Sequence, residues 1–145
     1  MIQEFIEVFD MKSVLVIESN DAIREAVNDL LLLVWPKLSI LTAATASKGL
    51  HLAQEHQPDL ILLEGEMAGT INGFQAAKVL RHLPETREIP LIAFTSPAFD
   101  NEQIIDGLQE TCNAWLHKPF SADNLLNVIR PFSEIMKTNV AQPAV

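Results

Sequence analysis

Five polar side chains stand where short apolar runs of the chain end. Glu18 and Ser19 follow the first of these runs, Glu64 follows the third, Thr95 ends the fourth and Lys118 follows the fifth. In an open parallel sheet, the carboxyl ends of the strands form the crevice where ligands bind. We therefore expect these side chains to surround one pocket, where the chemistry open to them is the positioning and neutralisation of charge.

Asp59 is the competing acid on the same run as Glu64. It lies at the opposite end of that run, about five residues or roughly 16 Å away, so it cannot serve the same pocket. The histidines show no metal-binding spacing with Cys112, and we expect them on the surface or in loops; they are His51, His56, His82 and His117. Cys112 is expected to be a small buried apolar side chain.

The apolar runs alternate with longer segments of helical spacing, which is the pattern of strands joined by crossover helices. The expected strands are 13–17, 38–44, 60–63, 90–95 and 114–117. The first and third are apolar on both faces, as buried parallel strands tend to be. We predict an α/β fold, a doubly wound five-stranded parallel sheet of order 2-1-3-4-5 with helices on both faces.

Five helices are expected between and after these strands. They run from about Asp21 to Val34, Ala46 to Glu55, Gly73 to just before Pro84, Asp100 to Thr111, and onward from Ser121. Asn20 or Asp21 can cap the first of them. Pro131 lies about ten residues into the last helix, where its missing N–H should kink the helix or divide it in two.

The composition fits one globular domain, with 145 residues of which 48% are hydrophobic. The formal charge of −9 argues against binding to a nucleic-acid backbone, so we expect a protein partner. The single cysteine cannot form an internal disulfide and no secretion signal is recognisable, so we expect a cytoplasmic protein. No apolar run approaches the roughly 20 residues that span a membrane.

Apolar residues at helical spacing occur at both ends of the chain, in an extension that precedes the expected domain of residues 12–138 and at the end of that domain. In the N-terminal extension, residues 1–11, the spaced residues are Ile2, Phe5, Ile6 and Phe9. This extension either docks on its own domain, stays disordered, or serves dimerisation or partner docking. Phe132, Ile135 and Met136 repeat the spacing before the tail of residues 139–145, and they suggest a homodimer through the last helix.

Four segments in order resemble the receiver domain of bacterial response regulators, which has the flavodoxin-like fold of the chemotaxis regulator CheY. The resemblance covers residues 12 to about 137. Its segments are VLVIESNDAIREAV, PDLILLEGEM, PLIAFTS and NAWLHKPFSADNLL. Any one match is weak, whereas four in the right order and spacing are specific.

The resemblance implies a role for each residue of the pocket. Glu64 stands where the family has its phosphoacceptor aspartate, and Glu18 and Ser19 stand where it has an acidic pair. In that family Mg²⁺ is held by these acids and by a backbone carbonyl, here that of Glu66. Thr95 and Trp115 match the switch positions, and Lys118 matches the lysine that pairs with the phosphoryl group; Trp115 is also expected to be a partly buried packing residue.

The departures from the family pattern affect the chemistry and leave the fold intact. Glu replaces the acceptor aspartate, Glu and Ser replace the acidic pair, Ala68 stands where proline is usual, and the loop before Gly73 is one residue longer. A misplacement of about 1 Å can reduce a rate on the order of 100-fold. Mg²⁺ requires near-octahedral oxygen ligands, and Ser19 offers a neutral hydroxyl. We expect weak Mg²⁺ binding at most and a poor phosphoryl acceptor.

These departures favour one of three functions. The first is a stand-alone receiver-like signalling protein that is not an enzyme and works through protein contacts, with Glu64 as a built-in partial mimic of a phosphorylated aspartate. The second is a conventional response regulator that accepts phosphate from a histidine kinase. The third, a nucleotide or flavin binder, would need a Gly-rich or hydroxyl-rich phosphate loop after the first strand, and ESNDAIRE is not one.

Overall fold

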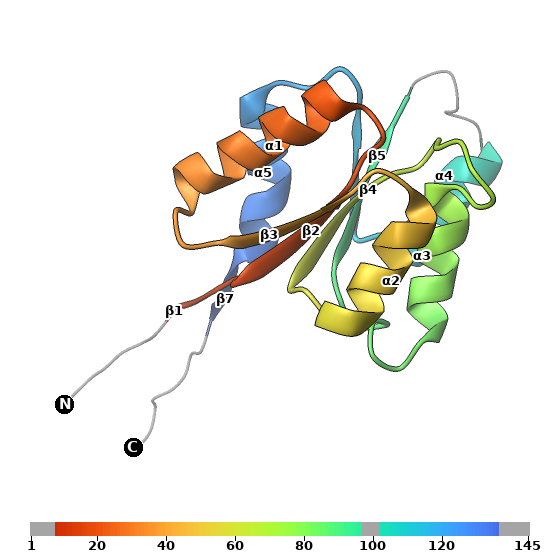
Figure 1. Cartoon of the computed structure of the whole chain (residues 1–145), viewed down its shortest axis with the longest axis horizontal. Coiled ribbons are helices and arrows are strands. Elements are labelled where there is room, and N and C mark those ends of the chain that lie inside the picture. The colour runs from red at the N-terminus through yellow and green to blue at the C-terminus, as the bar shows by residue number, and fades with distance from the viewer. Residues whose placement is uncertain (1–7, 97–101, 137–145) are drawn as a thin grey trace.

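A five-stranded parallel sheet forms the centre of the computed structural model, which describes residues 8–96 and 102–136. Its strand order is β3-β2-β4-β5-β6 (Figure 1). Because β1 lies outside this sheet, β2 is the first strand of the sheet, β3 the second, and so on. Counted in this way, the order is 2-1-3-4-5, which confirms the prediction. The strands are β2 (Ser13–Ile17), β3 (Ser39–Ala43), β4 (Leu60–Glu64), β5 (Leu91–Thr95) and β6 (Ala114–His117).

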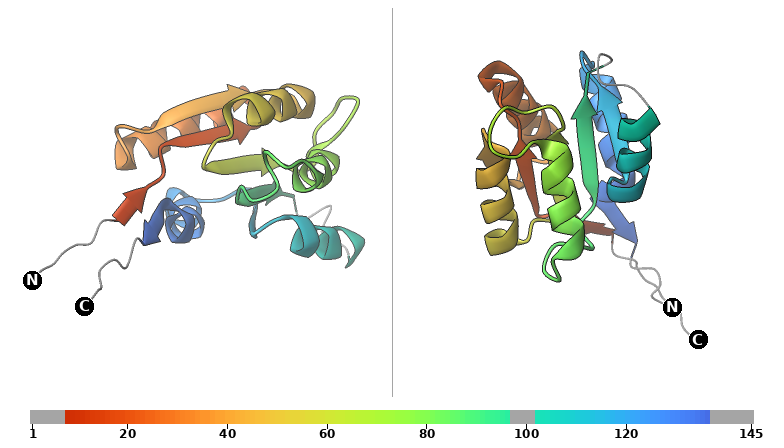
Figure 2. Two further views of the ribbon diagram at one scale, coloured as in Figure 1. Left: turned by 90° about the horizontal axis from the view of Figure 1, so that it is seen from below. Right: turned by 90° about the vertical axis from the view of Figure 1, so that its right-hand side faces the viewer.

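Five helices cover the two faces of this sheet. They are α1 (Asp21–Val34), α2 (Ala46–His56), α3 (Gly73–His82), α4 (Glu102–Thr111) and α5 (Ala122–Ser133). Helices α1 and α5 lie on one face, and α2, α3 and α4 lie on the other (Figure 2). Asn20 caps α1 as predicted, because its side chain accepts a hydrogen bond from the Ile23 N–H. The expected start of the fourth helix near Asp100 falls outside the described residues. None of the helices within 8–96 and 102–136 is long and apolar enough to cross a membrane.

Alternation along the strands divides the core into two layers. Successive strand side chains point to opposite faces. On β4, Ile61 and Leu63 pack with the helices α2, α3 and α4, while Leu60 and Leu62 pack with α1 and α5. Every residue of β4 and β5 is buried, as expected for parallel strands covered on both sides. These two buried strands end at Glu64 and Thr95, and so they position both residues at the carboxyl edge of the sheet.

The ends of the described chain form a second, two-stranded sheet that we did not predict. β1 (Val8–Asp10) pairs antiparallel with β7 (Glu134–Met136), with Phe9 opposite Ile135. The expectation of a helical stripe is therefore wrong at Phe9, and its other members, Ile2, Phe5 and Ile6, lie outside the described residues. Four apolar residues over eight positions are too few to distinguish a helix from a strand.

The last helix, α5, ends before the apolar residues Ile135 and Met136. α5 continues two residues beyond Pro131 to Ser133, so proline does not divide it into two helices. Ile135 and Met136 then belong to β7, so the expected helical extension of apolar surface is wrong for them. Proline disfavours continuation of the helix, because it has no N–H and its ring clashes with the preceding turn. Residues Glu134–Met136 instead form hydrogen bonds by pairing with β1. The homodimer itself stays a prediction.

Close contact between α3 and the end of β4 holds the Glu64 backbone in place. A Cβ atom on Gly73 would collide with the backbone carbonyl of Glu64, and one on Gly65 would collide with the Phe74 ring. The Gly73 N–H also donates to the Gly65 carbonyl at 2.9 Å. The first turn of α3 therefore packs directly on the residue pair that ends β4.

We predict that Gly73→Ala and Gly107→Ala change stability in opposite directions. Gly73→Ala should lower the free energy of unfolding by about 2 kcal/mol, because the methyl group overpacks a backbone contact. Gly107 lies within α4, and outside the backbone of that helix no atom of the described residues lies within 4 Å of an added Cβ. Its replacement by Ala should stabilise by about 0.5–1 kcal/mol, since glycine loses more entropy in a helix. Urea unfolding measures both, and equal effects would contradict the predicted contact at Gly73.

Candidate functional site

The Lys118 ammonium lies between two carboxylates at the carboxyl edge of the sheet. Its Nζ donates a hydrogen bond to Glu64 Oε2 at 3.0 Å and to Glu18 Oε2 at 3.0 Å. It is also 2.8 Å from Glu18 Oε1. Glu18 follows β2, Glu64 ends β4 and Lys118 follows β6, so one cation joins residues from three strands. The predicted convergence of these three side chains is confirmed.

Ser19 completes the hydrogen bonding of the Glu64 carboxylate. Glu64 Oε1 accepts from the Ser19 backbone N–H at 2.9 Å and from Ser19 Oγ at 2.7 Å. Both carboxylate oxygens of Glu64 are thus engaged, one by Ser19 and the other by Lys118. We had expected Ser19 to be only a weakened metal ligand, and its role as a double donor to Glu64 was not predicted. The signal that could have suggested this role is a carboxylate at the end of one strand, here β4, and a serine just after the end of the neighbouring strand, here β2.

Glu18 is the most deeply buried acid of the site, with no exposed surface. Its Oε2 accepts from the Asn20 N–H at 3.0 Å, in addition to the contact with Lys118. Arg24 steadies the same loop, since its guanidinium donates to the Glu18 carbonyl at 2.8 Å and pairs with Asp21. The sequence had not suggested a role for Arg24. Hydrogen bonds to both the side chain and the backbone carbonyl of Glu18 therefore hold the loop between β2 and α1 in place.

The three charged groups have shifted pKa values. Burial raises the pKa of Glu18, and this effect outweighs the hydrogen bonds from Lys118 and Asn20. Burial also opposes ionisation of Glu64, but the bonds from Ser19 and Lys118 together outweigh it and lower the pKa of Glu64. Burial disfavours the charged form of Lys118 as well, yet Glu18 and Glu64 raise its pKa. Lys118 and Glu64 are therefore charged at neutral pH.

The remaining residues predicted for the site lie around this triad. Thr95 is 4% exposed at the end of β5, and its Oγ1 has no hydrogen-bond partner in the described part of the chain. Glu66 Oε2 accepts from the Ser96 N–H at 3.4 Å, and burial raises the pKa of Glu66. Trp115 is half-buried against the core layer under α2, α3 and α4, which confirms it as a packing residue.

The residues of this site do not fit the ligand set that Mg²⁺ requires. Lys118 stands between the two carboxylates that would hold the ion, and the Ser19 hydroxyl donates a hydrogen bond to Glu64. Among residues 8–96 and 102–136, no three His, Cys, Asp or Glu side chains are grouped so that they could hold a metal ion. A cation entering here would compete with the Lys118 ammonium for both carboxylates.

The residues that we had set aside occupy structural positions. The Asp59 carboxylate accepts hydrogen bonds from the N–H groups of Lys12 and Ser13 at the opposite end of the sheet, as expected from its place just before β4. Cys112 is buried as predicted. His51, His56 and His82 are exposed on helices, whereas His117 is half-buried on β6, so the expectation of a surface or loop position is not met there.

Comparison with known proteins identifies the class to which this fold and site belong. Residues 14–130 match the response regulator receiver domain family. The chain therefore belongs to that family, and it is a receiver-type response regulator of two-component signalling. It is 31% identical over 123 residues to the polar-differentiation response regulator DivK of Brucella ovis and, equally, to that of Brucella abortus. Each alignment covers 83% of this chain and 95% of the relative.

Solved structures show the same fold at lower sequence identity. A putative response regulator from Chloroflexus aurantiacus superposes with a TM-score of 0.72 at 22% identity, covering 84% of this chain and 97% of that one. The receiver domain of the sensor histidine kinase PA1611 from Pseudomonas aeruginosa, solved with magnesium in its active-site cleft, gives 0.73 at 21% identity with the same coverage. Chemotaxis protein CheY4 of Vibrio cholerae superposes with a TM-score of 0.72 at 23% identity, and the alignment covers 84% of this chain and 98% of that one.

We predict that Lys118→Met destabilises the protein most between mildly acidic and alkaline pH. Removing one partner of a buried ion pair leaves uncompensated charge and should lower the free energy of unfolding by about 3 kcal/mol at pH 7. The pKa of Glu64 is lowered from 4.5, so its contribution is present above that pH and lost as the pH falls through the lowered value. The pKa of Lys118 is raised from 10.5, so its contribution is lost as the pH rises through the raised value.

Chemical denaturation at a series of pH values measures the difference in the free energy of unfolding between wild type and Lys118→Met. This difference should be largest near neutral pH and smaller at strongly acidic and strongly alkaline pH. Lys37→Met, at an exposed position, is the control and should change stability little. A difference that does not vary with pH would mean that Lys118 stabilises the fold by packing alone.

Proposed function

We propose that this receiver domain signals through protein contacts without being phosphorylated on an aspartate, and that it performs no phosphoryl-transfer chemistry. The observation that supports this most is the saturation of Glu64, whose two oxygens accept three hydrogen bonds from Ser19 and Lys118. A phosphoryl acceptor must present a free carboxylate oxygen to the donor at close range. Here every such approach competes with an existing charge-assisted bond.

Glu64 in this proposal acts as a fixed, partial substitute for a phosphorylated aspartate. Its carboxylate reaches Lys118, which in the resemblance is the residue that pairs with the phosphoryl group, and it holds that lysine at 3.0 Å. The substitution is incomplete, because Glu brings one charge and two oxygens where a phosphoryl group brings about −1.5 to −2 and three oxygens. The third oxygen of a phosphoryl group, which Glu64 lacks, would be a hydrogen-bond acceptor for Thr95. The buried Oγ1 of Thr95 has no hydrogen-bond partner among the described residues, which is consistent with this difference.

A conventional response regulator, which takes phosphate from a histidine kinase, is the alternative. The family relationship favours it, since receiver domains commonly work with such kinases. The substitutions at Glu18, Ser19 and Glu64 and the poor fit to Mg²⁺ oppose it, because phosphoryl transfer depends on metal-assisted charge neutralisation and positioning. The partner in either case is a protein, and in our proposal the active form needs no kinase.

The first test is whether the chain accepts a phosphoryl group. We predict that the wild type, incubated with Mg²⁺ and a small phosphodonor, keeps its intact mass. A variant with Asp at all three of positions 18, 19 and 64 should gain the mass of one phosphoryl group, because three carboxylates would then be free to hold Mg²⁺ and to accept phosphate. The variant with Asp only at 18 and 19 is the control and should not react. A mass gain by the wild type, mapped to Glu64, would return the protein to the conventional class.

The second test is whether the charge of Glu64 affects the rest of the domain. Glu64→Gln preserves shape, removes the charge and leaves Lys118 with only a neutral acceptor at this position. In a Trp35→Phe background, where Trp115 is the single tryptophan, we predict a shift in emission. Trp115 lies three residues before Lys118, which Glu64 contacts, so a shift in its emission would report a change in that segment. Asp59→Asn, at the other end of β4, should leave the emission unchanged, and the same result for Glu64→Gln would argue against the mimic.

A further inference from the structure

The peptide group between Glu18 and Ser19 is hydrogen-bonded at both of its ends. Its carbonyl oxygen, on Glu18, accepts from Arg24 Nη1 at 2.8 Å. Its N–H, on Ser19, donates to Glu64 Oε1 at 2.9 Å. The C=O and N–H of a trans peptide are fixed in one plane and point in opposite directions, so this plane lies between the Arg24 guanidinium and the Glu64 carboxylate. A rotation of the plane that breaks one of these bonds therefore also disturbs the other.

The charges at the two ends match the dipole of the peptide group. A peptide group is negative at its oxygen and positive at its N–H, with a dipole of about 3.5 D. Here the cation of Arg24 faces the oxygen and the anion of Glu64 faces the N–H. Both hydrogen bonds are charge-assisted, and bonds in such a chain polarise and strengthen one another. Arg24 is thus linked to Glu64 through the peptide group between them.

The place of Arg24 on α1 allows it to reach this carbonyl. Side chains of a helix are directed back toward its N-terminus, and the Glu18 carbonyl lies six residues before Arg24. Arg24 Nη2 also pairs with Asp21 at 2.6 Å, but the Asp21 side chain is 82% exposed, so that ion pair contributes little. The Arg24 side chain itself is only 20% exposed. Its bond to the Glu18 carbonyl is therefore the more consequential of the two.

The neighbouring peptide groups are held by other partners. The Glu18 N–H donates to the Ala43 carbonyl at 3.0 Å, and the Asn20 N–H donates to Glu18 Oε2 at 3.0 Å. These bonds fix the chain on either side of the Glu18–Ser19 peptide but leave the orientation of its plane open. That plane can rotate through the two dihedral angles beside it, ψ of Glu18 and φ of Ser19. Arg24 opposes this rotation.

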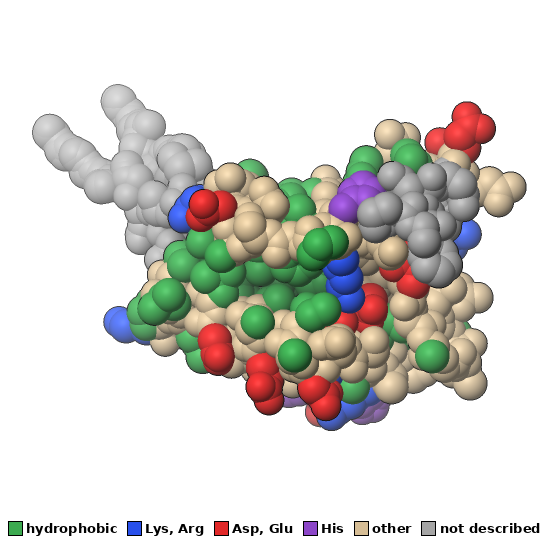
Figure 3. Space-filling model, turned by 90° about the horizontal axis from the view of Figure 1, so that it is seen from above, with side chains coloured by type: hydrophobic (Ala, Val, Ile, Leu, Met, Phe, Trp, Pro, Cys, Tyr) green, Lys and Arg blue, Asp and Glu red, His purple; other side chains and the backbone are tan. Residues whose placement is uncertain are grey.

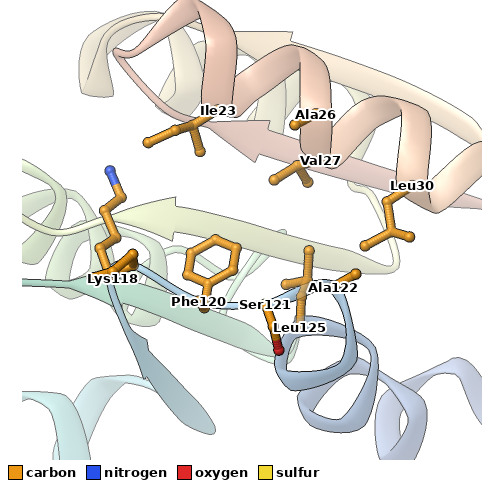
Figure 4. A pocket seen from close by; sticks show the side chains of 10 residues that line it. Ile23, Ala26, Val27, Leu30, Lys118, Phe120, Ser121, Ala122 and Leu125 are labelled. Atoms are coloured by element: carbon orange, nitrogen blue, oxygen red, sulfur yellow. The ribbon is translucent and has the colours of Figure 1, made fainter.

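Lys118 by itself does not fix the direction of the Glu64 carboxylate. Its ammonium is shared between Glu64 and Glu18. It also borders an open apolar hollow between α1 and the start of α5, and Figure 4 shows it at one end of this hollow, on the side of Ile23. Figure 3 shows the hollow as a green surface with basic and acidic side chains beside it. Ser19, which donates twice to one oxygen of Glu64, is the more definite constraint.

We propose that Arg24 is a positioning residue of this site, which holds the Glu18–Ser19 peptide group in the orientation that keeps Glu64 bound to Ser19 and directed at Lys118. This inference deepens the proposed function and rests on it for its meaning in signalling. The hydrogen bonds can be measured separately from signalling, so the two can fail independently. Unchanged Trp115 emission in Glu64→Gln would argue against the mimic and leave the role of Arg24 standing.

The Ser19 amide reports this contact directly. NMR of the isotope-labelled full chain measures how fast the Ser19 N–H exchanges with solvent. Arg24→Met keeps an unbranched side chain and removes the guanidinium. It should speed exchange of the Ser19 amide about tenfold, as expected when one hydrogen bond to a charged group is weakened. The Ser19 proton resonance should also move upfield, because its bond to the carboxylate lengthens.

Three controls separate this effect from a general loosening of the loop. The Ile23 N–H donates to Asn20 Oδ1 in the same loop, and its exchange in Arg24→Met should stay within about twofold of wild type. Asp21→Asn removes the ion pair and keeps the bond to the Glu18 carbonyl, so it should change Ser19 exchange by less than about twofold. Arg130→Met removes an exposed arginine of α5 and should leave the Ser19 amide unchanged.

A double-mutant cycle tests whether Arg24 acts through the bond to Glu64. In Glu64→Gln the Ser19 N–H faces a neutral acceptor, so Arg24→Met should speed Ser19 exchange at least about threefold less than it does in the wild type. Equal effects in the two backgrounds would overturn the proposal. So would an Asp21→Asn variant that matches Arg24→Met, or an Ile23 amide that speeds up as much as that of Ser19.

Discussion

The arrangement of this domain depends on one ammonium group shared by two carboxylates. Lys118 and Glu18 are 100 residues apart in the chain, and β6 and β2 are not neighbours in the sheet, yet the two side chains meet at hydrogen-bond distance. Glu18 has no exposed surface, so its charge is tolerable only with a partner. The strand ends must therefore come together around Lys118, and the loops that follow them take their places from this contact.

The unusual residues at positions 19 and 64 are best understood as a matched pair. Glu64 extends far enough to accept two hydrogen bonds from Ser19, one from the backbone and one from the hydroxyl. An aspartate at position 19 would instead place a third carboxylate beside Glu64 and would raise its pKa through like-charge repulsion. The serine lowers that pKa. Two departures from the family pattern that look independent in the sequence are thus one physical change.

Hydrophobic patterning determined most of the fold. The runs that became β2 to β6 are short, apolar and separated by amphipathic segments, and only a parallel sheet covered on both faces buries them all. Strand order then follows from the family resemblance, and the shared pocket of Glu18, Glu64 and Lys118 follows from the strand ends. These features depend on local composition and spacing, which a sequence displays directly.

Tertiary structure decided what the polar side chains do with one another. The sequence placed Ser19 and Arg24 near the site but could not assign the donors to Glu64 or the support of the Glu18 loop, because hydrogen bonds depend on distances of a few tenths of an ångström. The β1–β7 pairing escaped prediction because it joins the two ends of the described chain, where short apolar spacing suits helix or strand equally. Helices α1 and α5 are far apart in the sequence, and only the folded chain brings them together on the same face of the sheet.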